Sequence, residues 1–176
     1  MSPFPEFLSQ APLDRDALRA EVSDPAAGAI LVFEGTVRDH SDGLTGVVAL
    51  EYEAQPSMAA KVIAAILEEV RREIPIRKAA VRHRLGRVAL GEPTILIAVS
   101  AAHRDEAYRA SRAIIDHIKH RAPIWKREIL EDGTGEWSQG CVAHEEKVKV
   151  KSEKFKVLRQ RKNQWSRLSP ILHFAL

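Results

Sequence analysis

The adjacent residues His103 and Arg104 are the pair in this sequence best suited to bind an anion. They stand between an apolar segment, T-I-L-I-A-V-S-A, and a segment of helical periodicity that continues with Asp105 and Glu106. The first turn of a helix has free N–H groups and a partial positive charge, so acidic side chains are favoured there and cationic ones are not. The pair therefore indicates a phosphate or carboxylate site. An ordinary surface pair, with Arg104 neutralised by a nearby acid, explains the residues equally well.

Two lysines, Lys119 and Lys126, are the candidates for direct chemistry. Lys119 comes near the end of the predicted helix, where cations are favoured in any case, and His120 and Arg121 share that explanation. Lys126 is on a predicted strand, and Glu128 lies on the same side because strand side chains alternate. A solvated strand residue is the alternative for Lys126. A lysine held near other cations loses affinity for its proton and can act as a nucleophile or general base near neutral pH.

The other chemistry-bearing residues give weaker signals. Arg38 ends a predicted strand just before a turn, and alone it would be an exposed turn arginine. The sequence has no G-x-x-x-x-G-K-[ST], G-x-G-x-x-G or G-x-S-x-G motif, which argues against nucleotide loops and hydrolase elbows. The histidines lack ligand spacing, and Cys141 is the single cysteine, so no metal site or internal disulfide is predicted. A reducing cytoplasm is the default location.

Hydrophobic periodicity predicts the elements that position these residues. Helices are predicted for residues 13–22, 56–74 and 104–120, strands for 29–37, 47–54, 78–85, 94–101 and 124–130, and an extended edge segment for 3–9. We expect the strands at 29–37 and 47–54 to form a hairpin, because Ser41-Asp42-Gly43 is a turn signal. The order of elements predicts an α+β fold, with helices on one face of a mainly antiparallel sheet.

Charge is distributed unevenly along the 176 residues. Residues 1–144 hold 18 basic and 21 acidic residues, a net charge of −3, whereas residues 145–176 hold nine and three, a net charge of +6. We therefore expect a domain over 1–144 and a basic C-terminal extension over 145–176. Cations that cluster within the acidic domain indicate a local site. The longest apolar run, Thr94 to Val99, has the length of a strand, and no secretory signal is recognised.

An ordered set of segments resembles the large, catalytic subunit of molybdopterin synthase. The segments are F-E-G-T-V-R-D (33–39), L-E-Y-E-A-Q-P-S-M-A (50–59), H-R-L-G (83–86), S-A-A-H-R-D-E-A (100–107) and D-H-I-K-H-R-A-P-I-W-K-R-E (116–128), followed by Asp132-Gly133 and Trp137. Together they cover roughly residues 28–138. The sequence departs from the family at Gln55, where an aromatic residue is usual, and in its longer, more basic C-terminal extension.

The resemblance implies a sulfurtransferase of molybdenum cofactor biosynthesis. Such enzymes convert cyclic pyranopterin monophosphate into molybdopterin by installing the two sulfurs of its dithiolene. The sulfur comes from the C-terminal Gly-Gly thiocarboxylate of a small, ubiquitin-like subunit. The family forms a dimer of large subunits with a small subunit at each end, a heterotetramer in the cytoplasm. The resemblance also implies an α/β hammerhead fold and no requirement for a metal, ATP or another cofactor in this step.

The resemblance further implies the site residues. The positions that match the family's substrate-binding residues are Thr36, Val37, Arg38, His103, Arg104, Lys119, Lys126, Arg127 and Glu128. Arg38, His103 and Arg104 would bind the anionic phosphate and thiocarboxylate. Lys119 would take part directly, as a proton acceptor or through transient attachment to an intermediate. Lys126 would stabilise developing charge or transfer protons.

Two other classes of function remain open. The basic extension and the order of elements suggest a nucleic-acid-binding module, but the RNP pattern is absent, aromatic residues make up only 6%, and the domain is acidic. Nucleic acid and membranes are therefore not expected as partners. A non-catalytic scaffold that binds a ubiquitin-like protein is the other alternative, and it predicts that Lys119 and Lys126 are dispensable.

Overall fold

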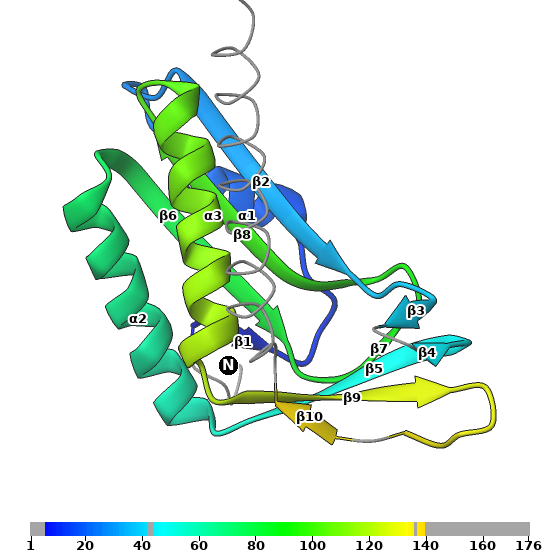
Figure 1. Ribbon diagram of the computed structural model, residues 1–176. Coiled ribbons are helices and arrows are strands. Elements are labelled where there is room, and N and C mark those ends of the chain that lie inside the picture. Colours follow the sequence, from blue (N-terminus) through cyan, green and yellow to red (C-terminus); the bar gives the residue numbers. More distant parts are fainter. Residues whose placement is uncertain (1–5, 42–43, 136, 140–176) are drawn as a thin grey trace, which may run out of the picture. The chain divides into compact units, whose positions relative to one another are not determined.

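A computed structural model describes residues 6–41, 44–135 and 137–139 of the chain (Figure 1). The predicted extension and its boundary at residue 144 lie outside the described residues. The helices of the described part are α1 (Arg15–Glu21), α2 (Pro56–Glu73) and α3 (Arg104–Arg121). Its strands are β1 (Leu8–Ser9), β2 (Ala29–Thr36), β3 (His40–Ser41), β4 (Leu44–Thr45), β5 (Val47–Ala54), β6 (Ile76–Arg84), β7 (Gly86–Ala89), β8 (Pro93–Ala101), β9 (Ile124–Leu130) and β10 (Trp137–Gln139).

The first sheet has the strand order β1-β6-β8-β2. Its central strand, β8, is antiparallel to both β6 and β2, and the short β1 is parallel to β6 at the edge. Every residue of β8 after Pro93 is buried. A strand covered on both faces has no solvated side, and so its sequence is a nearly continuous apolar run. The predicted central strand is confirmed, and within the extended edge segment predicted for 3–9 the strand is Leu8–Ser9, with residues 3–5 outside the described residues.

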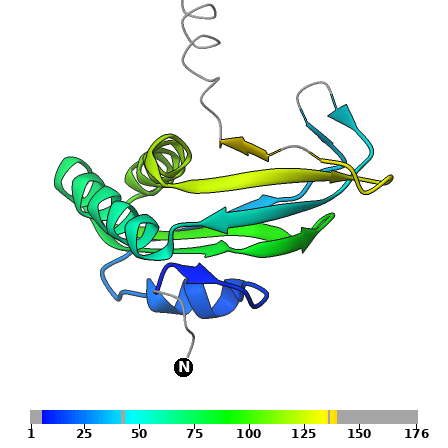
Figure 2. The same ribbon diagram turned by 90° about the horizontal axis from the view of Figure 1, so that it is seen from below.

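Helices cover both faces of this sheet. Ile63, Ile66 and Val70 of α2 are fully buried and belong to one core cluster with α3 and the first sheet. On the opposite face, Leu18 and Val22 form a smaller cluster with residues of β6 and β8. Figure 2 shows α1 on one side of the first sheet, with α2, α3 and the second sheet on the other.

The second sheet has the strand order β10-β9-β5-β7 and is antiparallel throughout. Ile124 of β9 is buried in the main core, and Tyr52 and Ala54 of β5 pack against that core. Side chains two residues apart on a strand share a face, so Lys126 and Glu128 lie on the same face as Ile124. We call this face the inner face of the second sheet.

The predicted hairpin between residues 29–37 and 47–54 is wrong. β2 pairs along its whole length with β8, from Ala29 opposite Ala101 to Thr36 opposite Pro93, whereas β5 lies between β9 and β7. The turn signal instead separates the short strands β3 and β4, which pair with each other. Local turn residues favour pairing of sequence neighbours, but burial against the apolar β8 is a non-local gain that outweighs it.

The α+β class and the mainly antiparallel pairing are confirmed. Two details differ from the expected single sheet with helices on one face. The strands divide into two four-stranded sheets and one two-stranded sheet, and α1 lies opposite α2 and α3. None of the described helices is long and apolar enough to span a membrane.

Candidate functional site

The N-terminus of α3 carries the predicted anion-binding pair. His103 is the N-cap residue, with φ −130° and ψ 162°, and its side chain makes no capping hydrogen bond. Arg104 begins the helix, and both side chains are exposed. Asp105 pairs with Arg109, at 3.3 Å between Oδ2 and Nη1. Within residues 6–41, 44–135 and 137–139, no acid neutralises Arg104, so its guanidinium and the His103 imidazole are available to an external anion.

The C-terminus of α3 carries Lys119, which is exposed. Its neighbours are engaged, since the Nδ1–H group of His120 donates to the carbonyl oxygen of Asp116 at 2.5 Å, and Arg121 Nη1 donates to Glu69 Oε2 at 2.7 Å. The hydrogen bond from Arg121 lowers the pKa of Glu69 below its ordinary value. No hydrogen bond or ion pair joins Lys119 to another residue of the described chain, so its amine is free to meet a substrate.

Lys126 forms an ion pair on the inner face of the second sheet. Its Nζ donates to Glu128 Oε1 at 2.8 Å, and the two side chains are 26% and 11% exposed. The prediction that Glu128 shares the side of Lys126 is confirmed, whereas the alternative of a solvated lysine is wrong. A carboxylate at this distance attracts the ammonium group and holds it on the inner face, where it can interact with an anion.

Arg127, between these two residues, points to the opposite face of β9. Its Nε lies 3.3 Å from Oε2 of Glu51 on the neighbouring strand β5, and both side chains are 34% exposed. The run 126–128 therefore divides into a pair on the inner face and an arginine on the outer face. Alternation along a strand makes this separation unavoidable.

Arg38 lies at the far end of β9 from Lys126. Val37 beside it is buried against Val47 and Val88, whereas Thr36 and Arg38 are exposed. The amide of Val47 donates to the carbonyl of Asp39, and Val47 pairs with Leu130 of β9. Lys126 is four residues further along that strand, or roughly 14 Å at the rise of an antiparallel strand.

The carboxylate nearest to Arg38 in sequence is already engaged. Asp39 Oδ1 accepts a hydrogen bond from His40 Nδ1 at 2.6 Å, and this bond lowers the pKa of Asp39. Arg38 has no recorded ion pair with the described residues. Its guanidinium is therefore available to bind an anion, as the sequence predicts.

The predicted residues on and after α3 fall into two groups at opposite ends of that helix, and Arg38 lies apart from both, beside the far end of β9. His103 and Lys119 are sixteen residues apart in sequence, which corresponds to roughly 24 Å along a helix. Figure 1 shows α3 running from the end of β8 to the start of β9, so its C-terminus, but not its N-terminus, lies beside the start of the strand that carries Lys126. A single copy of the chain brings Lys119 and Lys126 to the same end of α3 and leaves His103 and Arg104 remote.

Sequence reasoning missed two residues on the inner side of this region. Tyr52 stands opposite Lys126 in the register of β5 and β9. His83 of β6 lies against Tyr52, with ring centroids 4.9 Å apart and planes at 77°. The sequence predicted no ligand role for the histidines, and His83 is buried. Tyr52 and His83 belong to the segments L-E-Y-E-A and H-R-L-G, which support the family resemblance. Neither segment indicates that the two rings are in contact.

His83 predicts a specific dependence of stability on pH. Burial lowers its pKa from 6.5 to about 4, although the hydrogen bond to the Arg84 carbonyl partly opposes this. The unfolded chain takes up this proton near pH 6.5 and the folded chain only near pH 4. The folded state therefore loses about 3 kcal/mol from this residue as the pH falls through that interval. Urea unfolding at several pH values measures the loss, and a His83→Phe variant lacking it is the control. If the free energy of unfolding depended on pH equally in both proteins, the loss could not be assigned to His83.

Glu128 is expected to contribute to stability through its partner. Glu128→Gln removes the charge that faces the partly buried ammonium of Lys126, and we expect a loss of about 1–2 kcal/mol in the free energy of unfolding. Chemical denaturation at neutral pH measures this loss. Glu53→Gln, an exposed change on β5, is the matched control. If the two variants were equally stable, the ion pair would have no energetic role.

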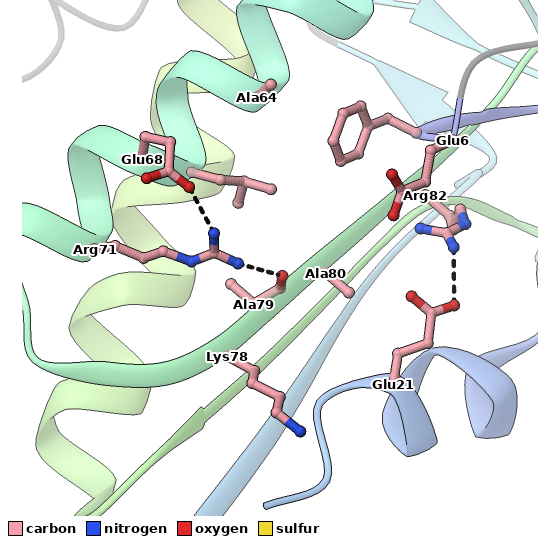
Figure 3. A pocket seen from close by; sticks show the side chains of 11 residues that line it. Glu6, Glu21, Ala64, Glu68, Arg71, Lys78, Ala79, Ala80 and Arg82 are labelled. Carbon is pink, nitrogen blue, oxygen red and sulfur yellow. Dashed lines mark hydrogen bonds and ion pairs between the residues drawn. The ribbon is translucent and has the colours of Figure 1, made fainter.

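A cavity of about 360 Å³ lies between α2, β6 and the N-terminal segment, and none of the predicted site residues lines it. Its cations are engaged with neighbouring groups (Figure 3): Arg71 bonds Glu68 and the carbonyl of Ala79, and Arg82 bonds Glu21. The cavity therefore offers no free cation for an anionic ligand. No group of three or more His, Cys, Asp or Glu residues that could hold a metal ion occurs in the described residues.

Comparisons with known proteins agree on one family. The family model described as MoaE protein matches residues 8–121. The molybdopterin synthase catalytic subunit of Thermoplasma volcanium is 52% identical over 126 residues, covering 72% of this chain and 89% of that protein. The protein of the same name from Nostoc sp. is 41% identical over 131 residues, covering 74% and 79%. A crystal structure of molybdopterin synthase from Staphylococcus aureus matches with a TM-score of 0.70 and 36% identity over 78% of this chain and 98% of that one.

Proposed function

Because this chain belongs to the MoaE protein family, we propose that it is the catalytic subunit of a molybdopterin synthase. Its reaction is the transfer of sulfur from the C-terminal thiocarboxylate of a small ubiquitin-like subunit to cyclic pyranopterin monophosphate. The observation that carries this proposal is the exposed amine of Lys119 near the C-terminus of α3. This end of the helix is followed by β9, which carries the Lys126–Glu128 ion pair. A non-catalytic scaffold that only binds a ubiquitin-like protein would not need a half-buried ion pair near an exposed lysine amine.

The charges of the site suit the reactants. Phosphate and thiocarboxylate are both anionic, and Arg38, Lys119 and Lys126 supply positive charge in a domain whose net charge is negative. Each transfer forms a C–S bond at a side-chain carbon of the pterin in place of a C–O bond, whose oxygen leaves with a proton. The C–S bond of the thiocarboxylate breaks as water restores a carboxylate on the small subunit. Lys119 accepts a proton or holds an intermediate covalently, and Lys126, held by Glu128, stabilises negative charge that develops on oxygen.

The separation along α3 leads to a second part of the proposal. His103 and Arg104 lie roughly 24 Å from Lys119 along the helix of one chain, and so they serve the same substrate only if a second copy supplies them. The resemblance implies a dimer of large subunits, in which a two-fold axis gives two equivalent sites. Each site would then combine Lys119 and Lys126 of one copy with His103 and Arg104 of the other.

A reconstituted assay tests this function. The purified chain is mixed with cyclic pyranopterin monophosphate and a thiocarboxylated small subunit, and molybdopterin is detected as its fluorescent oxidised derivative. We expect product that depends on all three components, with no added metal or nucleotide. The same small subunit carrying an ordinary carboxylate is the control. Binding of the small subunit without product would support the scaffold instead.

The proposed place of the reaction is the cytoplasm. The single cysteine, Cys141, leaves no internal disulfide for an oxidising compartment to form. A soluble phosphorylated precursor and a thiocarboxylate that must be kept from oxidation both suit a reducing compartment.

A further inference from the structure

Tyr52 is the nearest cross-strand neighbour of Lys126 on the inner face of the second sheet. Tyr52 of β5 stands opposite Lys126 of β9, and Leu50 stands opposite Glu128. Side chains paired across antiparallel strands have Cβ atoms about 4.5–5.5 Å apart and contact each other. On the β5 side, the ion pair is thus flanked by an aromatic ring and an aliphatic side chain, and on the other side Lys126 pairs with Ser138 of β10.

The ring of Tyr52 is held from its other side by His83. The two rings meet edge to face, with centroids 4.9 Å apart and planes at 77°. The Nδ1–H group of His83 donates to the carbonyl oxygen of Arg84 at 2.7 Å, and because a carbonyl only accepts, this bond fixes the tautomer. Burial keeps the imidazole neutral above about pH 4. His83 is therefore a rigid, uncharged support.

The backbone explains why these residues from two sheets meet. β6 ends at Arg84 in the first sheet, and β7 begins two residues later, at Gly86, in the second. Gly86 has φ +76°, a left-handed conformation that favours glycine. It also pairs with Tyr52 across the β5–β7 ladder. This corner fixes His83 next to Tyr52.

We propose that Tyr52 and His83 are positioning residues for Lys126. The ring of Tyr52, held by His83, confines the four-carbon stem of the lysine so that its ammonium stays at Glu128 and points to one place in the site. A free lysine side chain has many rotamers of similar energy, so a wall beside the stem is an effective way to limit them. The catalytic consequence rests on the proposed function, whereas the confinement itself does not.

The proposed role is that of the aromatic ring, so variants that keep or remove a ring test it. Tyr52 is partly buried and packs in both the main core and the cluster of Val37, Val47 and Val88. Tyr52→Phe keeps the ring and should retain the confinement, while Tyr52→Leu removes it. His83→Phe keeps an aromatic edge against Tyr52, and His83→Leu does not. Val88→Ala leaves both aromatic residues unchanged and weakens the cluster against which Tyr52 packs, so it is the control for a loss of packing alone.

The first readout is the reactivity of the Lys126 amine, which needs no turnover. The folded protein is treated briefly with acetic anhydride, and labelling of Lys126 is measured by mass spectrometry relative to Lys61, an exposed lysine of α2. We expect Tyr52→Leu and His83→Leu to raise this ratio severalfold, because a released lysine samples solvent more often. Tyr52→Phe, His83→Phe and Val88→Ala should remain near the wild type.

The second readout is the division of the effect between kcat and KM. A misplaced catalytic group slows the chemical step, so Tyr52→Leu should lower kcat about tenfold or more with little change in KM, and Tyr52→Phe should restore it. Unchanged labelling in both leucine variants, or equal losses in Tyr52→Leu and Val88→Ala, would overturn the inference. An inactive wild type would refute the proposed function instead, and the labelling ratio would still test the confinement.

Discussion

Lys119→Ala is expected to lower the turnover of the reconstituted enzyme by about a hundredfold or more, the magnitude typical of losing a group that acts directly on the reacting atoms. The amine stands free at the C-terminus of α3, and the neighbouring His120 and Arg121 are committed to Asp116 and Glu69. No neighbouring cation can therefore take its place without breaking an existing contact. The initial rate of molybdopterin formation, at saturating concentrations of precursor and small subunit, measures the loss.

Two further variants show whether the loss of turnover in Lys119→Ala comes from the missing amine or from the missing positive charge. Lys119→Arg keeps the positive charge but has no primary amine that can accept a proton from the substrate or bond to an intermediate, so it should be nearly as inactive as Lys119→Ala if the amine itself reacts. Lys61→Ala, a matched change of an exposed lysine on α2, should retain full activity. An active Lys119→Ala protein that still binds the small subunit would show that Lys119 only fills the favourable position for a cation at a helix end.

The second large effect is expected from mixing two inactive variants. One variant carries His103→Ala and Arg104→Ala, and the other carries Lys119→Ala. If each site draws its residues from two copies, a mixed dimer has one site with every lesion and one with none. It should therefore recover about half of the wild-type activity, although each parent dimer is inactive. Co-expression with two different affinity tags and purification on both isolates the mixed dimer for the assay.

The control for this experiment is a mixed dimer of Lys119→Ala with Lys126→Ala. Both lesions then lie at the same end of α3, so each of the two sites loses one lysine and activity should not return. An inactive mixed dimer of the first kind, with normal assembly and binding of the small subunit, would contradict the shared site. The 18-residue length of α3 would then have to be reconciled with a substrate bound at one end only.

Most elements of the described fold follow from local patterns in the sequence. The continuous apolar run of β8 and the helical spacing of α2 and α3 predict those elements within one or two residues of their observed ends. The first helix, predicted for 13–22, is observed at Arg15–Glu21, and Asp14 is its N-cap, with its carboxylate accepting from the amide of Ala17. These features depend on neighbours within one or two turns of the chain, which is why a single sequence reveals them.

Strand pairing is the part of the fold that the sequence predicted incorrectly. The turn residues at 41–43 pointed to a hairpin between β2 and β5, but β2 pairs with β8, some sixty residues away. The choice of partner depends on the apolar surface of distant strands, and local turn chemistry carries no information about it.

In the candidate site, too, features set by local pattern were predictable and features set by strand pairing were not. Alternation along β9 was enough to predict that Glu128 lies beside Lys126, and the ion pair confirms it. The same alternation separates Arg127, which the family resemblance had grouped with them. The support of Lys126 by Tyr52 and His83 was not predictable, because it requires the register of β5 against β9 and the corner between β6 and β7.

The most direct test of the central claim follows the sulfur donor itself. Intact-mass spectrometry of the thiocarboxylated small subunit is recorded during a reaction with the chain and the precursor. The account predicts that thiocarboxylate is replaced by carboxylate only when both are present, with two donors consumed for each molybdopterin formed, and that Lys119→Ala stops the replacement. A donor that keeps its sulfur while bound to the wild-type chain and supplied with precursor would contradict the proposed sulfur transfer.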